Sequence, residues 1–348
     1  MATAFGLDTF GDVTTGPEGG LLSQPEVIRN VVAEGILADR VGVDAFGVGE
    51  HHRDDFAVSA PDMVLAAIAA QTSRITLGTA VTVLSSDDPV RVYERFATLD
   101  AISGGRAEVT LGRGSFTESF PLFGYDLADY EVLFSEKLDL FARLRDEGVV
   151  DWSGTVRPPL TGARVFPPTA RGGLPAWIGV GGSPESVVRA ARYRMPMMLA
   201  IIGGPAVRFA PFVELHREAL REHGHPALPV GVHSPGFIAD TDEEAREIIT
   251  PHFIAQRTRI GRERGWGPAT ADQVHAEIED GALYVGSPET VARKIAATVQ
   301  GLGIDRFDLK YSNGAVPHEQ LAHCIELYGT QVIPRVRELL GEEGPAER

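Results

Sequence analysis

The sequence predicts an α/β protein, a single (β/α)8 (TIM) barrel with inserted loops. Short apolar stretches rich in β-branched residues alternate with longer amphipathic stretches along the 348 residues. This order is typical of parallel strands joined by crossover helices, and eight such units close most naturally into a barrel. The rival architecture, an open doubly wound sheet, is disfavoured because no G-x-G-x-x-G fingerprint follows the first expected strand.

The eight expected strands are short apolar runs bounded by polar or glycine-rich segments. In chain order they cover residues 3–7, 44–49, 75–81, 106–112, 176–180, 197–202, 230–238 and 306–310. The first expected helix begins with a capping box, because Ser23 precedes Glu26 by three residues. Further helices are expected over 61–71, 89–102 and 130–145 and from residue 184 onward, three of them with a proline in the first turn.

Three stretches look inserted, and one of them is rich in proline and glycine. They cover residues 149–174, 203–229 and 251–281. Because a barrel enzyme carries its chemistry at the carboxyl ends of the strands, loops inserted there are candidate lids. We expect one domain over residues 1–340 and a disordered tail over residues 341–348.

The charge balance limits the possible partners. Asp and Glu total 48 against 32 Lys and Arg, a formal net charge of −16, and such a surface repels the phosphate backbone of nucleic acids. We therefore expect no nucleic-acid partner. A small anionic ligand is still possible, because local groups can hold a phosphate within a field that is negative overall.

The sequence also limits where the protein can be located and what chemistry its cysteine can perform. No apolar run approaches the ~18 residues that a membrane-spanning helix needs, and the N-terminus lacks the basic segment of a secretory signal. We therefore expect no membrane contact and a cytoplasmic location. Cys324 is the only cysteine, which excludes an internal disulfide and a multi-cysteine metal site, and its apolar neighbours predict packing within a helix.

The first candidate group for chemistry is Glu50-His51-His52, directly after the second expected strand. Side chains alternate in direction along a strand, so His51 should point one way and Glu50 and His52 the other, which does not suit chelation of one metal. A single imidazole at the mouth of a barrel suits a general base near neutral pH. The alternative is a histidine that is merely hydrogen-bonded at a strand end.

Two further groups suit an anion. Arg113 stands between glycines after the fourth expected strand, where its planar fork can reach phosphate oxygens without crowding them. After the fifth expected strand, Gly181 and Gly182 lead into a helix start that carries the hydroxyls of Ser183 and Ser186 and exposed N–H groups. The alternatives are an ordinary surface arginine in a turn and a well-capped helix.

Together the three groups predict a phosphate held by Arg113 and the helix that begins at Ser183, with His51 facing the part of the ligand where bonds change. This arrangement is similar to a flavin mononucleotide (FMN) site. Four longer strings then carry a family resemblance: VGEHHR from Val48, ITLGTAV from Ile75, DPVRVYERFATLDAISGGRAEVTLGRG from Asp88 and IGVGGSPESVVRAA from Ile178. In their order and approximate spacing, the chain from Phe5 to about Leu327 resembles the bacterial luciferase-like flavin-dependent monooxygenases.

The resemblance implies a barrel that binds reduced FMN supplied by a separate flavin reductase and uses dioxygen to oxygenate a small organic substrate. His51 matches the catalytic histidine of the family, and Arg113, Ser183 and Ser186 match its phosphate ligands. Gly182, which follows Gly181, matches a position whose backbone lies against the phosphate. The resemblance is specific for the family and much less so for the substrate.

Other positions also follow from the resemblance. Ala80 and Val81 fall where relatives carry a non-prolyl cis peptide beneath the flavin ring. Relatives commonly form homodimers through helices beside the second and third strands, and residues 63–70 offer a small-residue apolar face for such a contact. Asp88 is a departure, since many relatives have histidine there; we expect Asp88 to cap the following helix, and the change counts against light emission with long-chain aldehydes.

The substrate pocket is expected to be apolar. Its predicted wall consists of residues that follow strand ends or open the adjoining loops, namely Phe10, Phe56, Phe116, Ile201 and Tyr311. No cluster of arginines indicates an anionic substrate.

Two alternatives stay open. Some barrels of this superfamily use a 5-deazaflavin for hydride transfer without oxygen, and both cofactors carry a phosphate on a ribityl chain, so Arg113 and Ser183 do not separate them. The other alternative is a flavin-binding protein without turnover. The presence of His51 and of lid-length insertions counts against it.

Overall fold

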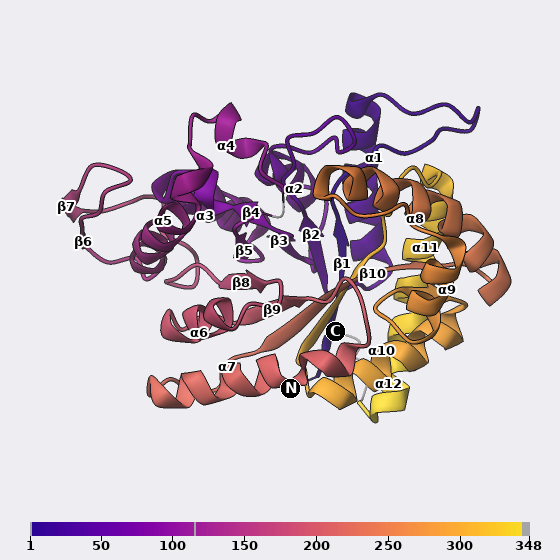
Figure 1. The fold of residues 1–348 in the computed structure, drawn as a ribbon. Helices are drawn as coiled ribbons and strands as arrows, with labels where there is room; N and C mark the ends of the chain where they lie inside the picture. Colours follow the sequence, from indigo (N-terminus) through magenta and orange to yellow (C-terminus); the bar gives the residue numbers. More distant parts are fainter. Residues whose placement is uncertain (1, 115, 343–348) are drawn as a thin grey trace.

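The computed structural model describes residues 2–114 and 116–342, so the expected tail lies outside the described residues from position 343 on. Parallel strands follow one another in the order β3-β2-β1-β12-β10-β9-β8-β5-β4, and they lie at the centre of Figure 1. The strands are β1 (Ala4–Thr9), β2 (Ala45–Val48), β3 (Thr76–Thr79), β4 (Thr82–Val83), β5 (Val109–Gly112), β6 (Val150–Trp152), β7 (Leu160–Ala163), β8 (Ala176–Val180), β9 (Met197–Ala200), β10 (Val230–Ile238), β11 (Tyr284–Gly286) and β12 (Arg306–Lys310).

The predicted barrel is confirmed, and each of the eight expected strands is present. The ring closes between β3 and the approach to β5, where the Leu77 N–H donates to Arg106 O (2.9 Å) and the Glu108 N–H donates to Leu77 O (3.0 Å). Strands β4, β6, β7 and β11 are not among the predicted ones. β4, β6 and β11 have only two or three residues, too few to show an alternating pattern, and β7 lies with β6 in the stretch expected to be an inserted loop.

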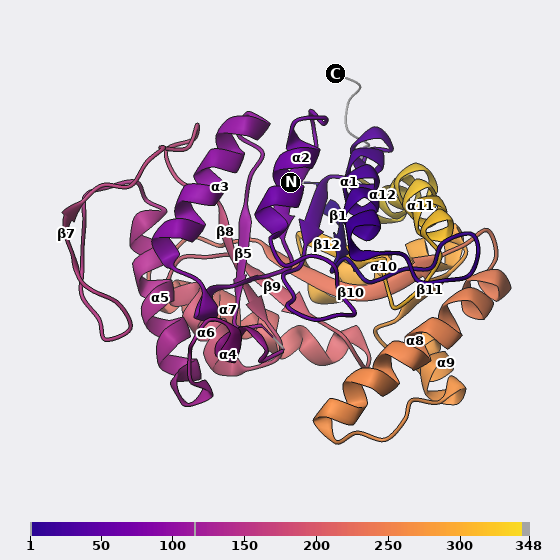
Figure 2. The same ribbon diagram turned by 90° about the horizontal axis from the view of Figure 1, so that it is seen from above.

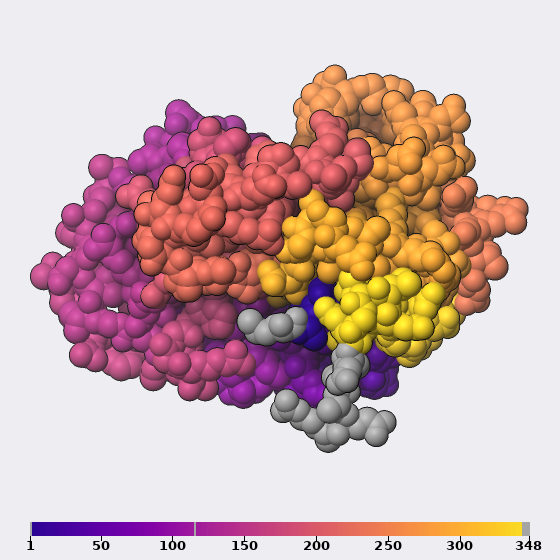
Figure 3. Space-filling view, turned by 90° about the horizontal axis from the view of Figure 1, so that it is seen from below, coloured from indigo at the N-terminus to yellow at the C-terminus, as the bar shows by residue number. Residues whose placement is uncertain are grey.

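Helices surround the strands (Figures 1 and 2). They are α1 (Gln24–Arg40), α2 (Pro61–Ala69), α3 (Pro89–Ser103), α4 (Ser119–Leu122), α5 (Tyr130–Leu144), α6 (Pro184–Arg192), α7 (Ala210–Glu222), α8 (Asp242–Arg264), α9 (Ala271–Glu279), α10 (Pro288–Leu302), α11 (His318–Leu327) and α12 (Ile333–Leu340). Short 3-10 turns cover Leu84–Ser86, Leu127–Asp129 and Ala206–Phe209, and a π-helical turn covers Tyr328–Val332. One side of the molecule is covered by α7, α10 and α12 (Figure 3). Within the described ranges, no helix combines the length and the apolar character needed to cross a bilayer.

Two predicted helix starts are confirmed. Glu26 Oε2 accepts a hydrogen bond from the Ser23 backbone N–H (3.0 Å), as a capping box requires. Asp88 Oδ1 accepts hydrogen bonds from the N–H groups of Val90 (2.9 Å) and Arg91 (3.3 Å). Asp88 therefore caps α3, the role expected for it.

The three expected insertions differ in structure. Residues 149–174 contain the antiparallel hairpin β6–β7, which forms a sheet of its own. Residues 203–229 contain α7, which connects β9 to β10 and so belongs to the regular barrel unit. Residues 251–281 contain the end of α8 and all of α9, a helical hairpin that projects from the barrel at the lower right of Figure 2. This hairpin is the insertion that reaches the site described below.

Glycines make room for charged side chains inside the barrel. Gly6 in β1 pairs with Asp308 in β12, and Gly47 in β2 pairs with Asp8 in β1. A Cβ at either glycine would collide with the neighbouring carboxylate oxygen, so the strands accept no side chain there. Asp8 and Asp308 therefore both point into the barrel.

These carboxylates belong to a buried polar network. Arg306 Nη1 donates to Glu108 Oε1 (2.5 Å), and Arg306 Nε donates to Asp308 Oδ1 (2.8 Å). Nearer the carboxyl ends of the strands, Asp8 Oδ2 lies 2.5 Å from His233 Nδ1. Burial raises the pKa of Asp308 to about 7, although the adjacent Arg306 opposes this shift. The barrel interior below the site is thus polar, internally paired and closely packed.

The cysteine packs within a helix, as predicted. Cys324 is fully buried in α11, and its Sγ accepts a hydrogen bond from the Ile238 N–H (3.3 Å). Burial raises the pKa of the Cys324 thiol to about 12. The thiol is therefore protonated at neutral pH and is unsuited to nucleophilic chemistry.

Candidate active site

A small cavity at the strand ends brings together several predicted site residues. It has a volume of about 70 Å³, and its lining includes Phe10, His51, Ala80, Val81 and Phe116. These residues follow β1, β2, β3 and β5, so four strand ends contribute to one cavity. In a barrel, the carboxyl ends of the strands are where catalytic residues are found.

His51 is enclosed by aromatic rings in this cavity. Its ring centroid lies 4.7 Å from that of Phe10, 4.3 Å from that of Phe56 and 5.4 Å from that of Phe116. Phe10 in turn stacks on His233 of the barrel interior, with centroids 5.8 Å apart and an interplanar angle of 8°. The aromatic enclosure predicted from the sequence is therefore present for three of its five members.

The surroundings keep His51 uncharged. Burial, together with the nearby positive groups of Lys310, Arg53 and His52, lowers the pKa of His51 to about 3. Its Nδ1 atom is buried and hydrogen-bonds to none of the described residues. A neutral imidazole with an unpartnered buried nitrogen can exchange a proton with a ligand beside it.

The alternation predicted for Glu50-His51-His52 is confirmed. Glu50 Oε1 lies 3.0 Å from His52 Nε2, and Glu50 Oε2 accepts a hydrogen bond from the Val83 N–H (2.9 Å), while His51 packs on the phenylalanines. Glu50 thus ties the loop after β2 to β4. In the part of the chain that the structure describes, no group of three or more His, Cys, Asp or Glu residues is arranged to hold a metal.

The peptide bond between Ala80 and Val81 is cis, as the resemblance implies. The Val81 side chain lies against β5 and β8: a Cβ at Gly112 would collide with Val81 Cγ2, and a Cβ at Gly179 would lie 3.1 Å from Val81 Cγ1. These two glycines give the Val81 side chain its space, and both Ala80 and Val81 line the cavity.

The predicted anion-binding residues come together at the ends of β5 and β8. Arg113 Nη2 donates to Ser186 Oγ (3.3 Å), and Ser186 Oγ lies 3.4 Å from Ser183 Oγ. Ser183 caps α6 by accepting a hydrogen bond from the Ser186 N–H (3.3 Å). Gly182 has a φ of +100°, and a Cβ at Gly181 would meet open space. The corner thus offers a guanidinium, two hydroxyls and a helix N-terminus to one anion.

Two residues at this corner were not predicted. Glu131, at the start of α5, accepts hydrogen bonds from Arg113 Nη1 (3.2 Å) and from Arg189 of α6. Glu131 lies far from either arginine in the sequence, so spacing does not connect them. A signal did exist for Arg189, because it follows Ser186 by three residues and therefore shares its helix face.

Three predicted pocket residues do not line the cavity: Phe56 packs on His51 behind it, and Ile201 and Tyr311 lie away from it. Lys310 in β12 reaches the Phe10 ring, so the next residue, Tyr311, points outward; Tyr311 is fully buried, and its OH donates to Glu34 Oε2 of α1 (2.6 Å). Ile201 follows β9 and is likewise fully buried. The reason is strand alternation, which turns both side chains toward the surrounding helices.

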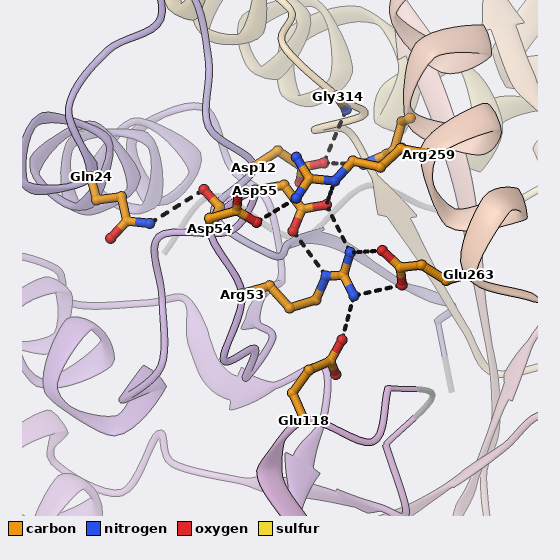
Figure 4. A network of polar contacts seen from close by, with 10 residues as sticks. Asp12, Gln24, Arg53, Asp54, Asp55, Glu118, Arg259, Glu263 and Gly314 are labelled. Carbon is orange, nitrogen blue, oxygen red and sulfur yellow. Dashed lines mark hydrogen bonds and ion pairs between the residues drawn. The ribbon is translucent and has the colours of Figure 1, made fainter. Parts of the chain in front are cut away.

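Arg53, two residues after His51, is the centre of an ion-pair network over the strand ends (Figure 4). Its Nε donates to Asp55 Oδ1 (2.9 Å), its Nη2 donates to Glu263 Oε1 (2.6 Å), and its Nη1 donates to Glu118. The Arg53 side chain is only 6% exposed. The network joins the loop after β2, the loop after β5 and the end of α8.

The same helix makes further contacts with the loops at the strand ends. Arg259 Nε lies 3.2 Å from Asp55 Oδ2, and Gln256 Nε2 donates to Asp12 Oδ1 (2.5 Å) in the loop after β1. The Phe116 ring has guanidinium groups 4.5 Å and 5.3 Å from its centroid, those of Arg53 and Arg264. The α8 end of the hairpin is thereby fixed over the aromatic enclosure of His51.

Comparison with known families matches residues 9–306 to the model of the luciferase-like monooxygenases. The alkanal monooxygenase alpha chain of Photorhabdus luminescens is 29% identical over 231 residues, a match that covers 65% of this chain and 63% of that one. The uncharacterized protein y4vJ of Sinorhizobium fredii (strain NBRC 101917 / NGR234) is 31% identical over 337 residues, covering 92% of this chain and 94% of that protein.

Solved structures share the fold. Monooxygenase RslO1 from Streptomyces bottropensis has a TM-score of 0.76 at 24% identity, covering 95% of this chain and 99% of that one. The oxygenating constituent of 3,6-diketocamphane monooxygenase from Pseudomonas putida, in complex with FMN, has a TM-score of 0.77 at 19% identity. The match covers 96% of this chain and 99% of that one. Coenzyme F420-dependent tetrahydromethanopterin reductase from Methanopyrus kandleri has a TM-score of 0.73 at 19% identity. The match covers 97% of this chain and 100% of that one.

Proposed function

The chain belongs to the luciferase-like monooxygenase family, and from this premise we propose that it is the oxygenating component of a two-component monooxygenase. It takes reduced FMN from a separate flavin reductase and uses dioxygen to oxygenate a small, apolar or mildly polar organic substrate. The observation that carries the proposal is His51, a neutral imidazole with an unpartnered Nδ1, enclosed by phenylalanines next to Ala80 and Val81.

The corner between β5 and β8 fits the phosphate of FMN. Arg113 supplies a planar pair of donors, and Ser183 and Ser186 supply hydroxyls at the N-terminus of α6. A phosphate dianion suits this set because hydrogen bonds from a guanidinium and from helix N-terminal amides are strengthened by its charge. Ala80 and Val81, which line the cavity, are the proposed support for the flavin ring.

The residues of this chain have separate tasks in the reaction. Bound reduced FMN supplies the electrons that activate dioxygen. His51 is uncharged at neutral pH, so its Nδ1 is free to accept and return a proton, and the negative charge of a bound anion would offset the burial that disfavours the protonated imidazole. Phe10, Phe56 and Phe116 keep water from this nitrogen and so limit side reactions.

The proposal is tested by anaerobic reconstitution with reduced FMN, followed by addition of isotopically labelled dioxygen and a panel of aldehydes, ketones and aromatic compounds. We expect one labelled oxygen atom in a product, detected by mass spectrometry. His51→Gln is expected to bind FMN normally and to form product about 100-fold more slowly. His323→Gln, on the exposed face of α11, is the matched control and should behave as wild type.

Flavin oxidation without any labelled product over the whole panel would favour a flavin-binding protein without turnover. A deazaflavin is the second candidate cofactor, because the F420-dependent reductase from Methanopyrus kandleri shares the fold. Arg113 does not separate the two cofactors, since each carries a phosphate. Tight binding of the deazaflavin, seen in its absorbance spectrum, together with substrate-dependent hydride transfer without oxygen uptake would replace the monooxygenase proposal.

A further inference from the structure

We propose that Glu131 is a built-in competitor for the flavin phosphate, and that Arg189 is the second cation of the phosphate site. This inference rests on the proposed function, because it concerns the same corner between β5 and β8. The carboxylate of Glu131 contacts two arginines at once, and its two oxygens are divided between them. Arg113 Nη1 lies 3.2 Å from Oε2, and Arg189 Nη2 donates to Oε1.

The position of Arg189 makes it a phosphate ligand. It lies one helical turn after Ser186 on α6, so both side chains leave the same face of the helix, beside Arg113. The Arg189 side chain is 17% exposed, and its guanidinium lies 5.5 Å from the Phe134 ring centroid, which holds it in place. Its Nη1 atom is buried and has no hydrogen-bond partner among the described residues. Arg189 therefore has one donor that none of the described residues uses, and its Nη2 becomes available to an anion when Glu131 leaves.

Glu131 can leave the arginines at small cost. Its side chain is 56% exposed and is also hydrogen-bonded by Ser135 Oγ (3.2 Å), one turn further along α5. Ion pairs with this exposure contribute little to stability, because water solvates the separated charges well. A phosphate carries a larger charge and more acceptor oxygens than a carboxylate, so it is the stronger partner for two guanidinium groups.

A second carboxylate occupies the hydroxyl part of the same corner. Ser183 Oγ donates to Glu185 Oε2 (2.7 Å), so this hydroxyl must turn before it can donate to a phosphate. Arg113 and Arg189 carry two positive charges, and Glu131 and Glu185 carry two negative charges. A dianion entering this balanced corner must move at least the carboxylate that lies between the arginines. Flavin affinity is thus the outcome of an exchange between Glu131 and phosphate.

The experiment compares FMN with riboflavin, which has the same ring and no phosphate, by quenching of tryptophan fluorescence in the full-length protein. Glu131→Gln keeps the size of the side chain but removes its charge, and we expect it to tighten FMN binding about three- to tenfold and to leave riboflavin binding unchanged. Arg189→Gln is expected to weaken FMN binding about tenfold with riboflavin again unchanged, and Arg189→Lys should restore part of the affinity. Glu218→Gln, an exposed carboxylate on α7, controls for the change in net charge.

Each outcome decides between the proposals. Unchanged or weaker FMN binding by Glu131→Gln overturns the competition, and so does an equal gain for FMN and riboflavin. Unchanged FMN binding by Arg189→Gln removes Arg189 from the phosphate site. If the wild-type protein binds FMN no more tightly than riboflavin, the phosphate site of the proposed function fails as well. Preference for FMN in the wild type, without an effect of Glu131→Gln, refutes this inference alone.

Discussion

Arg53 and Arg113 both follow a strand of the barrel, yet they are held in different ways. The Arg53 side chain is 6% exposed and pairs with three carboxylates from two loops and α8 (Figure 4). The Arg113 side chain is 30% exposed and contacts a single carboxylate, together with one hydroxyl. The first arginine joins segments of the protein, and the second keeps donors within reach of solvent.

The two sites differ in the exposure of the arginine and in the number of carboxylates that share it. A largely buried guanidinium that is shared by three carboxylates is fixed, and removing it leaves those carboxylates without a counter-charge. A guanidinium with an exposed partner can exchange that partner for a ligand at little cost. An arginine at the mouth of a barrel is therefore assigned to structure or to binding by its own exposure and by the number of acids that share it.

The largest expected effect comes from Arg53→Ala. It should lower the free energy of unfolding by roughly 2–4 kcal/mol, because it removes one cation from three carboxylates. Urea unfolding measures this loss, and FMN affinity should change little. Arg91→Ala is the control, since its pair with Glu94 is exposed and should contribute less than about 0.5 kcal/mol. Equal losses in the two variants would contradict the structural role of Arg53.

Arg113→Ala should show the reverse behaviour. We expect FMN binding to weaken by roughly 1.5–3 kcal/mol, as loss of a charge-assisted contact to phosphate does. The free energy of unfolding should fall by less than about 1 kcal/mol, because its ion pair is exposed. Flavin titration and urea unfolding of the same preparations give both values. A large loss of stability with unchanged flavin affinity would make Arg113 a structural residue like Arg53.

His51 sharpens the comparison, because it lies beside Arg53 and is buried without charge. Its pKa is about 3 in the folded protein and near its ordinary value of about 6.5 in the unfolded chain, so the unfolded state binds the proton first as the pH falls. Stability linked to His51 is therefore complete above pH 6.5 and decreases toward pH 3. Between pH 8 and pH 5 the free energy of unfolding should fall by roughly 1–2 kcal/mol more in wild type than in His51→Gln. The same pH dependence in both proteins would show that folding leaves the pKa of His51 near its ordinary value.

The smallest expected effect is that of salt. Raising sodium chloride from 0.05 to 0.5 M should weaken FMN binding several-fold, since Arg113 and its anion face solvent. The ion pairs of Arg53 are screened much less, so the free energy of unfolding should change by no more than a few tenths of a kcal/mol through them. Riboflavin serves as the control ligand, because it lacks the charge. A salt effect on riboflavin equal to that on FMN would contradict a phosphate-specific site.

The regular part of the fold was predictable because its signals are local. The strands β8, β10 and β12 have the expected bounds: β8 is an apolar run that ends at glycine, and β12 alternates charged and apolar residues. His51, Arg113 and Ser183 were predictable for the same reason: a strand end, flanking glycines and a helix cap mark them. The cis peptide between Ala80 and Val81 came from the family resemblance and not from any local pattern.

The features of the fold and of the site that were not predicted depend on contacts between segments that are far apart in the sequence. Tyr311 points away from the cavity because its direction follows from that of Lys310, and an inward lysine is understandable only once the polar interior of the barrel is known. Glu131 and Arg189 meet because α5 approaches α6, which neither helix reveals alone. The network of Arg53 likewise joins residues that are more than 200 positions apart.

The buried group of Arg306, Glu108 and Asp308 also limits how this barrel can diverge. Loss of Arg306 alone leaves two acids unpaired in the interior, and loss of one acid leaves the arginine short of a partner, whereas joint replacement by apolar residues of similar volume can be tolerated. Gly6 is free to acquire a side chain only after Asp308 has gone. Four positions far apart in the sequence therefore depend on one another: Gly6, Glu108, Arg306 and Asp308. Homologues should either keep all four residues or have replaced them together.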